Sequence, residues 1–219
     1  FKCDFCQVYG LTETCGAGTI LPPEDHDPAL GKLRSCGKSA ATAEVRILGE
    51  QGQLLPPNEV GEIVYQSKSL MKGYWNNREA TAKSIQDGWF FTGDAGYLDE
   101  DGYLYIHDRI KDMIVSGGEN VYPAEVENAL FAHEAVGDVA VIGVPDDKWG
   151  EAVKAIIVLK PNAEANEADI ISHCRDKIAG YKVPKSIDFT DVLPRNPSGK
   201  LLKRELRQPY WEGKTRQIN

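Results

Sequence analysis

The sequence predicts a mixed α+β protein with a small antiparallel, β-barrel-like subdomain followed by a compact α+β domain. Two patterns lead to this prediction. Between residues 44 and 107 short apolar runs alternate with turn residues, whereas beyond residue 109 strand-like runs alternate with longer helical patterns. With 219 residues, 42% of them hydrophobic, the chain can bury a sizeable core.

The β-rich part consists of short strands separated by turns. Asp101-Gly102 marks a hairpin, because glycine accepts a positive φ and aspartate does so nearly as well. One helix interrupts the strands, with Asn77 able to cap its start and Gly88 to stop it. The expected elements are strands at 44–49, 59–67 and 89–94, the helix 78–85 and the hairpin 97–106.

The α+β part contains amphipathic helices. Pro123 suits a first helical position, and Gly180 is expected to end the second helix. Apolar positions at helical spacing are Val126, Ala129 and Leu130 in one helix and Ile170, Ile171, Cys174 and Ile178 in the next. We place the domain boundary at 109–112. The expected elements are strands at 113–117, 136–144, 152–159 and 186–189, and helices at 123–133, 167–180 and 201–207.

Composition excludes several classes of protein. The net charge of −8 argues against a general affinity for nucleic acid or an anionic membrane. The longest apolar runs, 139–144 and 155–159, are far shorter than the roughly 18 residues of a membrane span. Five scattered cysteines and no readable secretory leader predict reduced thiols in the cytoplasm. Cys3, Cys6 and Cys15 leave a zinc site as a minor alternative.

Two further features concern the chain ends. The only methionines are Met71 and Met113, so Phe1 is not a translation start, and we expect the chain to be part of a longer protein. Residues 195–216 carry seven Lys and Arg against two Glu, a net of +5. Such a basic tail suits a compact polyanion such as a nucleotide, or is simply a solvated helix face.

Two polar segments in the first half could bind a nucleotide. In YGLTET, residues 9–14, Tyr9 offers a flat face for a base, and Gly10 allows close backbone approach. Thr12 offers a hydroxyl to a phosphate, and Glu13 is a hard oxygen ligand for Mg²⁺; alternatively the segment is a polar turn with a capping Thr. In FFTGD a Thr92-Gly93 turn presents Asp94, either to ribose hydroxyls or as an Asx cap.

Three more segments follow. The run 108–123, DRIKDMIVSGGENVYP, alternates charges at the boundary and contains Gly117-Gly118, which permits unusual backbone angles. The run 144–151, VPDDKWGE, is best interpreted as a surface turn. In 194–207, PRNPSGKLLKRELR, a Pro-Ser-Gly turn presents Lys200 at the start of a short basic helix, where its ammonium could meet a carboxylate or phosphate.

The ordered set YGLTET, FFTGD, DRIKDMIVSGGENVYPAEVE and NPSGK resembles the adenylate-forming superfamily of acyl-CoA synthetases, firefly luciferase and peptide-synthetase adenylation domains. The resemblance covers essentially all 219 residues. GGENVYP and NPSGKLLKRELR look most like fatty-acyl-CoA or related CoA ligases. The implied domains are 1–25, the end of a large N-terminal domain; 26–108, its β-rich subdomain; 109–112, a hinge; and 113–219, a mobile α+β C-terminal lid domain.

The resemblance also implies residue roles. Tyr9 would stack on adenine, Thr12 would touch the α-phosphate, and Glu13 would bind Mg²⁺. Asp94 and Arg109 would hold the ribose hydroxyls. The implied nucleotide-binding set is Tyr9, Gly10, Thr12, Asp94, Ile106 and Arg109, and the implied catalytic set is Lys200, Thr12 and Glu13.

In the second half, Lys111 would be the hinge residue. Lys200 would bridge the substrate carboxylate and the α-phosphate during adenylation. In the rotated state the thiol of CoA would enter a tunnel lined by Ser116, Gly117, Gly118 and Glu119.

The implied activity is that of an ATP- and Mg²⁺-dependent, AMP-forming fatty-acid–CoA ligase, which makes acyl-AMP and then an acyl-CoA thioester. The family's upstream phosphate loop is missing, so we expect the chain alone to be inactive and to have an exposed N-terminal surface that could self-associate. Two alternatives stay open: a non-catalytic nucleotide- or CoA-binding or docking module, and an adenylating enzyme that transfers the acyl group to a carrier protein or to oxygen.

Overall fold

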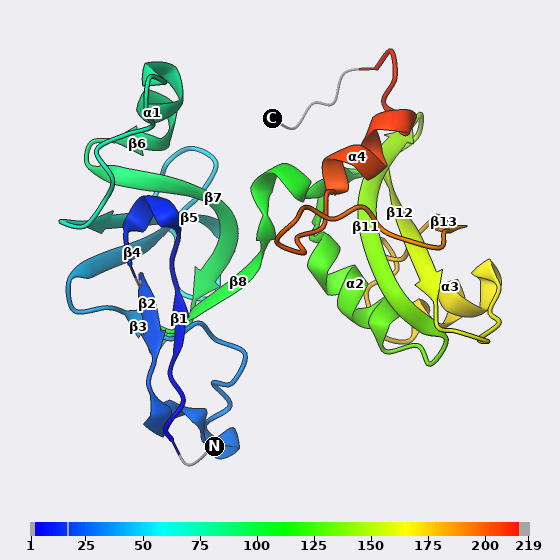
Figure 1. Cartoon of the computed structure of the whole chain (residues 1–219), viewed down its shortest axis with the longest axis horizontal. Coiled ribbons are helices and arrows are strands. Elements are labelled where there is room, and N and C mark those ends of the chain that lie inside the picture. The colour runs from blue at the N-terminus through cyan, green and yellow to red at the C-terminus, as the bar shows by residue number, and fades with distance from the viewer. Residues whose placement is uncertain (1–2, 17, 215–219) are drawn as a thin grey trace. The chain divides into compact units, whose positions relative to one another are not determined.

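The computed structural model describes residues 3–16 and 18–214, and Figure 1 shows the course of the chain. The chain forms two compact units, Phe1–Ile110 and Lys111–Asn219. The division between them falls inside the segment 109–112. Both units combine strands with short helices, so the predicted mixed α+β class is confirmed.

The first unit is built on a five-stranded antiparallel sheet that curls into a half barrel (Figure 1), as predicted. Its spatial order is β4-β5-β7-β6, with β8 also paired to β7. The strands are β4 (Ala43–Leu48), β5 (Gly61–Ser67), β6 (Ile85–Gln86), β7 (Trp89–Leu98) and β8 (Leu104–Arg109). The buried core side chains of the sheet are Val45, Ile47, Ile63, Tyr65, Phe90 and Leu104.

A smaller antiparallel sheet carries the first polar motif. It has the order β1-β2-β3, and the loop between β1 and β2 contains most of YGLTET. The Gly18 N–H donates to the Tyr9 carbonyl at 2.7 Å and closes this loop. The strands are β1 (Gln7–Tyr9), β2 (Thr19–Leu21) and β3 (Lys38–Ser39), and the 3-10 helices are η1 (Thr12–Thr14), η2 (Pro23–His26) and η3 (Pro28–Leu30).

Two local signals in the first unit are confirmed, but Gly88 does not end the helix, which stops at Ser84; Gly88, at a φ of +81°, lies in the turn between β6 and β7. Asn77 Oδ1 accepts a hydrogen bond from the Ala80 N–H at 3.0 Å and caps α1 (Arg78–Ser84). Strands β7 and β8 form the predicted hairpin, with Gly102 at a φ of +81° in the connection. Because these signals act over a few residues, turn chemistry alone could predict them.

The predicted Thr92-Gly93 turn is wrong. Strand β7 runs without interruption through this position, and Asp94 lies inside the strand. Gly93 has a φ of +71°, and the pairing of β5 with β7 shifts register nearby, between Glu62 and Val64. The glycine therefore kinks a continuous strand rather than ending it.

The second unit contains a mixed sheet, and two of its helices pack on the sheet to form a hydrophobic core. The strand order is β10-β9-β12-β11, and β13 pairs with β12 in parallel. The strands are β9 (Ile114–Ser116), β10 (Glu119–Val121), β11 (Val136–Asp146), β12 (Gly150–Leu159) and β13 (Ser186–Phe189). The helical segments are η4 (Ile110–Asp112), α2 (Pro123–Phe131), α3 (Glu167–Arg175), α4 (Lys203–Arg207) and η5 (Gln208–Tyr210).

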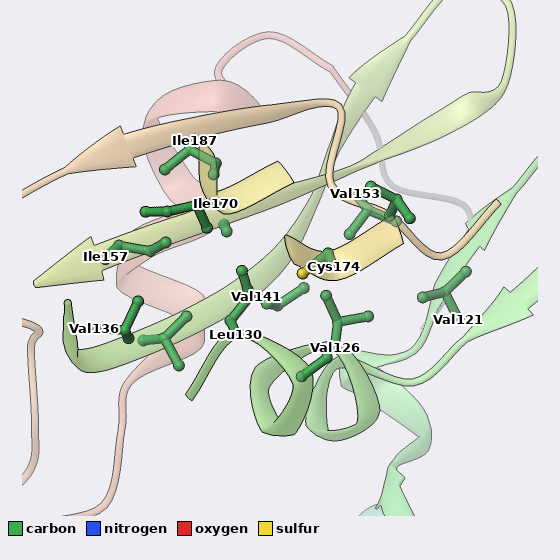
Figure 2. Close-up of a cluster of buried hydrophobic side chains, with 14 of the residues drawn as sticks. Val121, Val126, Leu130, Val136, Val141, Val153, Ile157, Ile170, Cys174 and Ile187 are labelled. Carbon is green, nitrogen blue, oxygen red and sulfur yellow. The ribbon is translucent and has the colours of Figure 1, made fainter. Parts of the chain in front are cut away.

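The β11–β12 hairpin is buried on both faces. Helices α2 and α3 contribute side chains such as Leu130 and Ile170 to one core, where they meet Val141 and Ile157 (Figure 2). Residues of opposite parity face a second cluster, made of Ala140, Ile142, Ile156 and Leu193 with Leu201, Leu206 and Tyr210 packed against it. The C-terminal segment is thus part of the packed structure.

The predicted helices of this unit are present but shorter than expected. The helix expected to end at Gly180 stops at Arg175, and the Cys174 carbonyl then accepts from Lys177 and Ile178 in a turn. Ile178 still packs on the core. The apolar spacing that predicted a longer helix therefore continues into the turn that follows the helix. The helices expected at 123–133 and 201–207 span 123–131 and 203–207.

A partly exposed charge cluster attaches the C-terminal segment to the sheet. The Lys154 ammonium lies 2.7 Å from Asp188 Oδ1, and the Tyr210 hydroxyl donates to Asp188 Oδ2. Burial alone would raise the pKa of Asp188, but hydrogen bonds from Lys154 and Tyr210 hold it below its usual range. Burial, and then the Asp188 carboxylate, raise the pKa of Tyr210 to about 12.

We predict that Asp188→Asn lowers the free energy of unfolding at pH 7 by about 1 kcal/mol, since the pair is partly exposed. An aspartate with a depressed folded pKa stabilises above its unfolded value of about 3.9, and this contribution is lost as the pH falls through the folded pKa. The raised Tyr210 pKa contributes below about pH 10 and is lost as the pH rises through about 12.

Denaturant unfolding from pH 3 to 9 measures this effect. The difference between Asp188→Asn and the natural sequence should be constant from pH 5 to 9 and narrow below about pH 4. Asp191→Asn, which changes an exposed neighbour, should leave stability unchanged. An equal difference at pH 3 and pH 7 would contradict the assignment.

Candidate active site

Three of the residues proposed to bind the nucleotide meet at the Asp94 carboxylate in the first unit. Arg109 is the cross-strand partner of Asp94 on β8, and its Nε lies 2.7 Å from Asp94 Oδ1. The Tyr9 hydroxyl, at the end of β1, donates to Asp94 Oδ2 at 2.8 Å. Asp94 is only 6% exposed, so both donors compensate a largely buried charge.

The backbone around Asp94 is held by residues that the sequence analysis did not assign to the site. Thr92 Oγ1 accepts from the Asp94 N–H at 3.1 Å and donates to the Ile63 carbonyl at 2.7 Å. The Gly93 N–H donates to Glu62 Oε1 at 3.1 Å. Burial, and to a smaller degree the nearby Asp94 charge, raise the pKa of Glu62. Only the kinked strand brings Glu62 here, so no local motif indicated it.

The Tyr9 ring is fixed by its hydroxyl. Burial, followed by the charge of Asp94, raises the pKa of Tyr9 far above its ordinary value, so the phenol stays protonated and acts as a donor. A carboxylate offers about four lone-pair positions, so Asp94 retains acceptor capacity beyond its two partners. Ile106 is 38% exposed on the adjacent strand β8.

The YGLTET segment, which the sequence predicts to bind phosphate, contains the 3-10 turn η1. Its hydroxyl anchor is Thr14, whose buried Oγ1 accepts from the Leu11 N–H at 2.9 Å. The sequence predicted a capping Thr in this segment but did not indicate which one. Gly10 and Thr12 are exposed, so both are accessible to a ligand.

The loop after β5 holds this turn at three points. The Tyr74 hydroxyl donates to Glu13 Oε1 at 3.0 Å, and the Met71 N–H donates to the Glu13 carbonyl at 2.8 Å. Ser69 Oγ donates to the Thr14 carbonyl at 2.9 Å. Burial and the Glu13 carboxylate raise the pKa of Tyr74. Tyr74 was not predicted, because its partner lies 61 residues away in the sequence.

The residues present suit a magnesium ion shared with substrate phosphates. Within the described residues no group of three or more His, Cys, Asp and Glu is arranged to hold a metal ion, so the zinc alternative at Cys3, Cys6 and Cys15 gains no support. Mg²⁺ usually takes one or two carboxylates together with phosphate oxygens and water. Glu13, half-buried and oriented by Tyr74, fits this single-carboxylate role.

We predict that Tyr74→Phe raises the Mg²⁺ concentration for half-maximal rate by about fivefold in the complete protein. The variant loses one hydrogen bond to a charged group, worth about 1 kcal/mol at this exposed position, and leaves the Glu13 carboxylate free to rotate. Initial rates at varied Mg²⁺ measure the effect. Trp75→Phe, in the same loop but 92% exposed, is the matched control. An equal response of both variants would contradict this role for Tyr74.

In the second unit the proposed CoA-tunnel residues form the β9–β10 hairpin. Ser116 pairs with Glu119, and the two glycines between them have φ values of +64° and +87°. The Gly117 N–H donates to the Trp149 carbonyl at 2.8 Å, and a Cβ on Gly117 would lie 2.6 Å from the indole ring. The segment VPDDKWGE contains the exposed turn between β11 and β12, as predicted, and its Trp149 also packs on the β9–β10 hairpin.

The side chains of Asn196 and Arg195 organise the turn that carries Lys200, and Arg195 Nη1 donates to the Gly199 carbonyl at 2.9 Å. Asn196 Oδ1 accepts from the Ser198 N–H at 3.1 Å and from the Lys200 N–H at 2.8 Å. Gly199, at a φ of +83°, completes the turn. The Lys200 side chain is exposed, just before α4.

The basic tail is partly neutralised by the body of its own unit. Its ion pairs are Arg195 with Asp138 at 2.7 Å, Lys203 with Glu127 at 2.8 Å and Arg207 with Asp112 at 2.8 Å. Three of the seven basic residues of the tail are therefore paired with acidic residues of the same unit. Arg216 lies outside the described residues.

Residues 1–75 match the family model described as AMP-binding enzyme, and residues 125–200 match the AMP-binding enzyme C-terminal domain. The chain belongs to this family, the adenylate-forming superfamily of AMP-forming acid–thiol ligases. It is 43% identical over 217 residues to the fatty acid–[acyl-carrier-protein] ligase ScoC of Streptomyces coeruleorubidus, covering 99% of this chain and 42% of that protein. It is 49% identical over 204 residues to the long-chain-fatty-acid–CoA ligase FadD13 of Mycobacterium tuberculosis, covering 93% and 40%.

A solved structure agrees in fold. The o-succinylbenzoate CoA synthetase MenE of Bacillus subtilis, in complex with its acyl-adenylate intermediate OSB-AMP, has a TM-score of 0.84 at 43% identity, covering 92% of this chain and 40% of that chain. MenE has also been solved with ATP and a magnesium ion. This chain therefore spans about two fifths of the length of these relatives. Among its described residues, none of the helices combines the length and hydropathy that crossing a bilayer requires.

Proposed function

We propose that this chain is the C-terminal part of an ATP-dependent, AMP-forming fatty-acid–CoA ligase. The observation that carries the proposal is the buried Asp94 carboxylate, which Arg109 and Tyr9 orient next to a turn suited to phosphate and Mg²⁺. The relatives ScoC and FadD13, both named as ligases of fatty acids, favour a fatty acid as substrate. All five cysteines are free, which favours a reducing, cytoplasmic location.

On the nucleoside side, Asp94 accepts the ribose hydroxyls with its remaining lone pairs, and Arg109 holds the carboxylate in position. The Tyr9 ring, fixed through its hydroxyl, offers a flat surface to adenine. Ile106 contributes apolar surface beside the nucleoside. Because these groups are already in place, little order is lost when the nucleotide binds.

On the phosphate side, Gly10 allows close approach, and the Thr12 hydroxyl donates to the α-phosphate. Glu13 holds Mg²⁺, which neutralises phosphate charge when bound. The substrate carboxylate oxygen attacks the α-phosphorus, forming the acyl–phosphate bond while the bond to the β-phosphate bridging oxygen breaks and pyrophosphate leaves. The exposed Lys200 ammonium lowers the repulsion between the two anions.

The second half-reaction uses the other face of the C-terminal domain. Rotation about Lys111, in the hinge 109–112, removes Lys200 and brings in the hairpin residues Ser116, Gly117, Gly118 and Glu119. The sulfur of CoA then attacks the acyl carbon, the bond to AMP breaks, and the thiol proton passes to solvent. A carrier-protein thiol is the second candidate acceptor, which the resemblance to ScoC favours.

Mass spectrometry of reaction products tests the proposal. This chain and the complete protein are each incubated with ATP, Mg²⁺, CoA and carboxylic acids of increasing length. We expect AMP and acyl-CoA from the complete protein alone, with the chain length given by the product mass. Adenylate without thioester would indicate carrier-protein transfer. No AMP from the complete protein would overturn the proposal and leave a non-catalytic binding module.

Two exposed apolar side chains lie at the edge strand β1 of the small sheet: Val8 is in the strand and Phe5 precedes it. We propose that preceding residues of the complete protein cover them, and that the chain alone self-associates there. Light scattering of the chain with and without Val8→Lys, which places a charge on the edge strand, measures this. Equal mass for both proteins would contradict it.

A further inference from the structure

One ion pair ties the start of the second unit to its C-terminal helix. Arg207 Nη1, at the end of α4, lies 2.8 Å from Asp112 Oδ1, across 95 residues of sequence. Both side chains are largely buried, with 13% and 14% exposure. Burial matters here because a solvent-exposed ion pair contributes little to stability. Removing one partner of a buried pair leaves an uncompensated charge and destabilises the fold strongly.

The segment that carries Arg207 is itself rigidly attached. Lys203, on the same helix, pairs with Glu127 of α2 at 2.8 Å. The Trp211 Nε1–H, just beyond η5, donates to the Gly143 carbonyl in β11 at 2.9 Å. The guanidinium therefore extends from the packed body of the unit, and Asp112 is held to that body.

The residues become more buried from Lys111 to Ile114. Lys111 is exposed and lines an open pocket of about 630 Å³ with Arg204, Gln208 and Trp211. Asp112 is held by Arg207, and Ile114 is fully buried in the core. Arg207 Nη1 also donates to the Lys111 carbonyl at 3.5 Å, so the peptide plane between Lys111 and Asp112 belongs to the second unit. A backbone rotation can thus be absorbed at the φ and ψ bonds of Lys111, whereas a rotation beyond Asp112 would break the ion pair and disturb the core.

We propose that Arg207 is a positioning residue that sets the C-terminal limit of the hinge at Lys111. Arg207 fixes Asp112, the last residue of the hinge segment, to α4. The turn that carries Lys200 directly precedes α4, so Asp112 and this turn belong to one rigid body. The orientation of Lys200 then depends on the few dihedral angles up to Lys111. This inference rests on the proposed function for its catalytic consequence, but the restraint itself is a property of this chain.

Hydrogen exchange of this chain, followed by mass spectrometry, tests the restraint without catalysis. In Arg207→Gln the amides of 111–114 should exchange about tenfold faster, since the ion pair no longer opposes local opening. Lys203→Gln is the matched control, because it breaks an equally short and similarly buried pair on the same helix, whose partner lies on α2. It should raise exchange at 111–114 much less than Arg207→Gln does, because Trp211 still anchors the segment to β11 and the Arg207–Asp112 pair is intact.

Two further variants separate the ion pair from general loosening of the tail. Arg207→Lys keeps the charge and should recover part of the protection. The double variant Asp112→Asn with Arg207→Gln should exchange no faster than Arg207→Gln alone, because the two residues act as one pair. Equal exchange at 111–114 in Arg207→Gln and the natural sequence, or the same increase in Lys203→Gln, would overturn the proposal.

The catalytic consequence is measured in the complete protein. Arg207→Gln should slow adenylate formation by about tenfold with little change in the KM for ATP, because nucleotide contacts are intact and the lysine is less well oriented. Faster exchange with unchanged adenylation would limit Arg207 to a structural role and overturn its positioning role. A natural complete protein that forms no adenylate would instead count against the proposed function.

Discussion

Lys200→Ala in the complete protein is expected to reduce adenylate formation by about a hundredfold or more, while sparing thioester formation from preformed acyl-AMP. In the first step a carboxylate approaches a phosphate, and one ammonium that neutralises the developing charge is worth about 10²–10³ in rate. In the second step the thiol attacks an acyl carbon with the lysine withdrawn. The charge therefore matters for only one half-reaction.

Each half-reaction is measured separately, by pyrophosphate release and by acyl-CoA formation from synthetic acyl-AMP. Lys214→Ala is the control, because Lys214 is an exposed lysine of the same tail. It should leave both rates unchanged. Equal losses in both half-reactions of Lys200→Ala would remove the assigned role, since the turn around Asn196 is built from backbone and side-chain bonds that do not involve the ammonium.

Asp94→Asn is expected to weaken ATP binding in the complete protein by about a hundredfold and to lower the stability of the first unit by about 2 kcal/mol. The amide can accept from only one of the two donors that now contact the carboxylate, so Arg109 and Tyr9 cannot both keep their bonds. A buried pair that loses one charge is costly, although the partial exposure of Arg109 moderates the loss. The ribose also loses an anionic acceptor.

Calorimetric titration with ATP measures the first effect, and denaturant unfolding of this chain measures the second. Asp101→Asn provides the control, because Asp101 pairs with Lys32 in an exposed position of the same unit. It should change stability by less than about 1 kcal/mol and leave ATP affinity unaltered. If Asp94→Asn bound ATP as the natural sequence does, Asp94 would not hold the ribose.

Local structure was predictable wherever its signal was local. The Asn77 cap, the Asp101-Gly102 hairpin and the Asn-Pro-Ser-Gly turn before Lys200 depend on residues a few positions apart, and each is present. Helix ends were less predictable. Apolar spacing continued through Ile178, but the helix had ended at Arg175, because a turn can place the same side chain on the core.

Contacts between distant segments could not be predicted in the same way. Tyr9 and Asp94 are 85 residues apart, and Tyr74 and Glu13 are 61 apart. Trp149 lies in the surface turn that was predicted, but its contact with Gly117, 32 residues earlier in the sequence, was not predicted. No periodicity or turn preference encodes which strands become neighbours, because that depends on sheet register and on the packing of whole elements.

The sequence by itself determined the mixed fold class, the order of most elements and the succession of motifs that marks an adenylate-forming enzyme, since these follow from short-range backbone preferences and residue identity. The tertiary structure alone decided that Asp94 lies inside a kinked strand between Arg109 and Tyr9, and that Arg207 restrains Asp112. In both, a largely buried carboxylate is paired with a side chain from a different segment of the chain. Such pairings form only where packing brings two segments together and excludes the water that would otherwise solvate them.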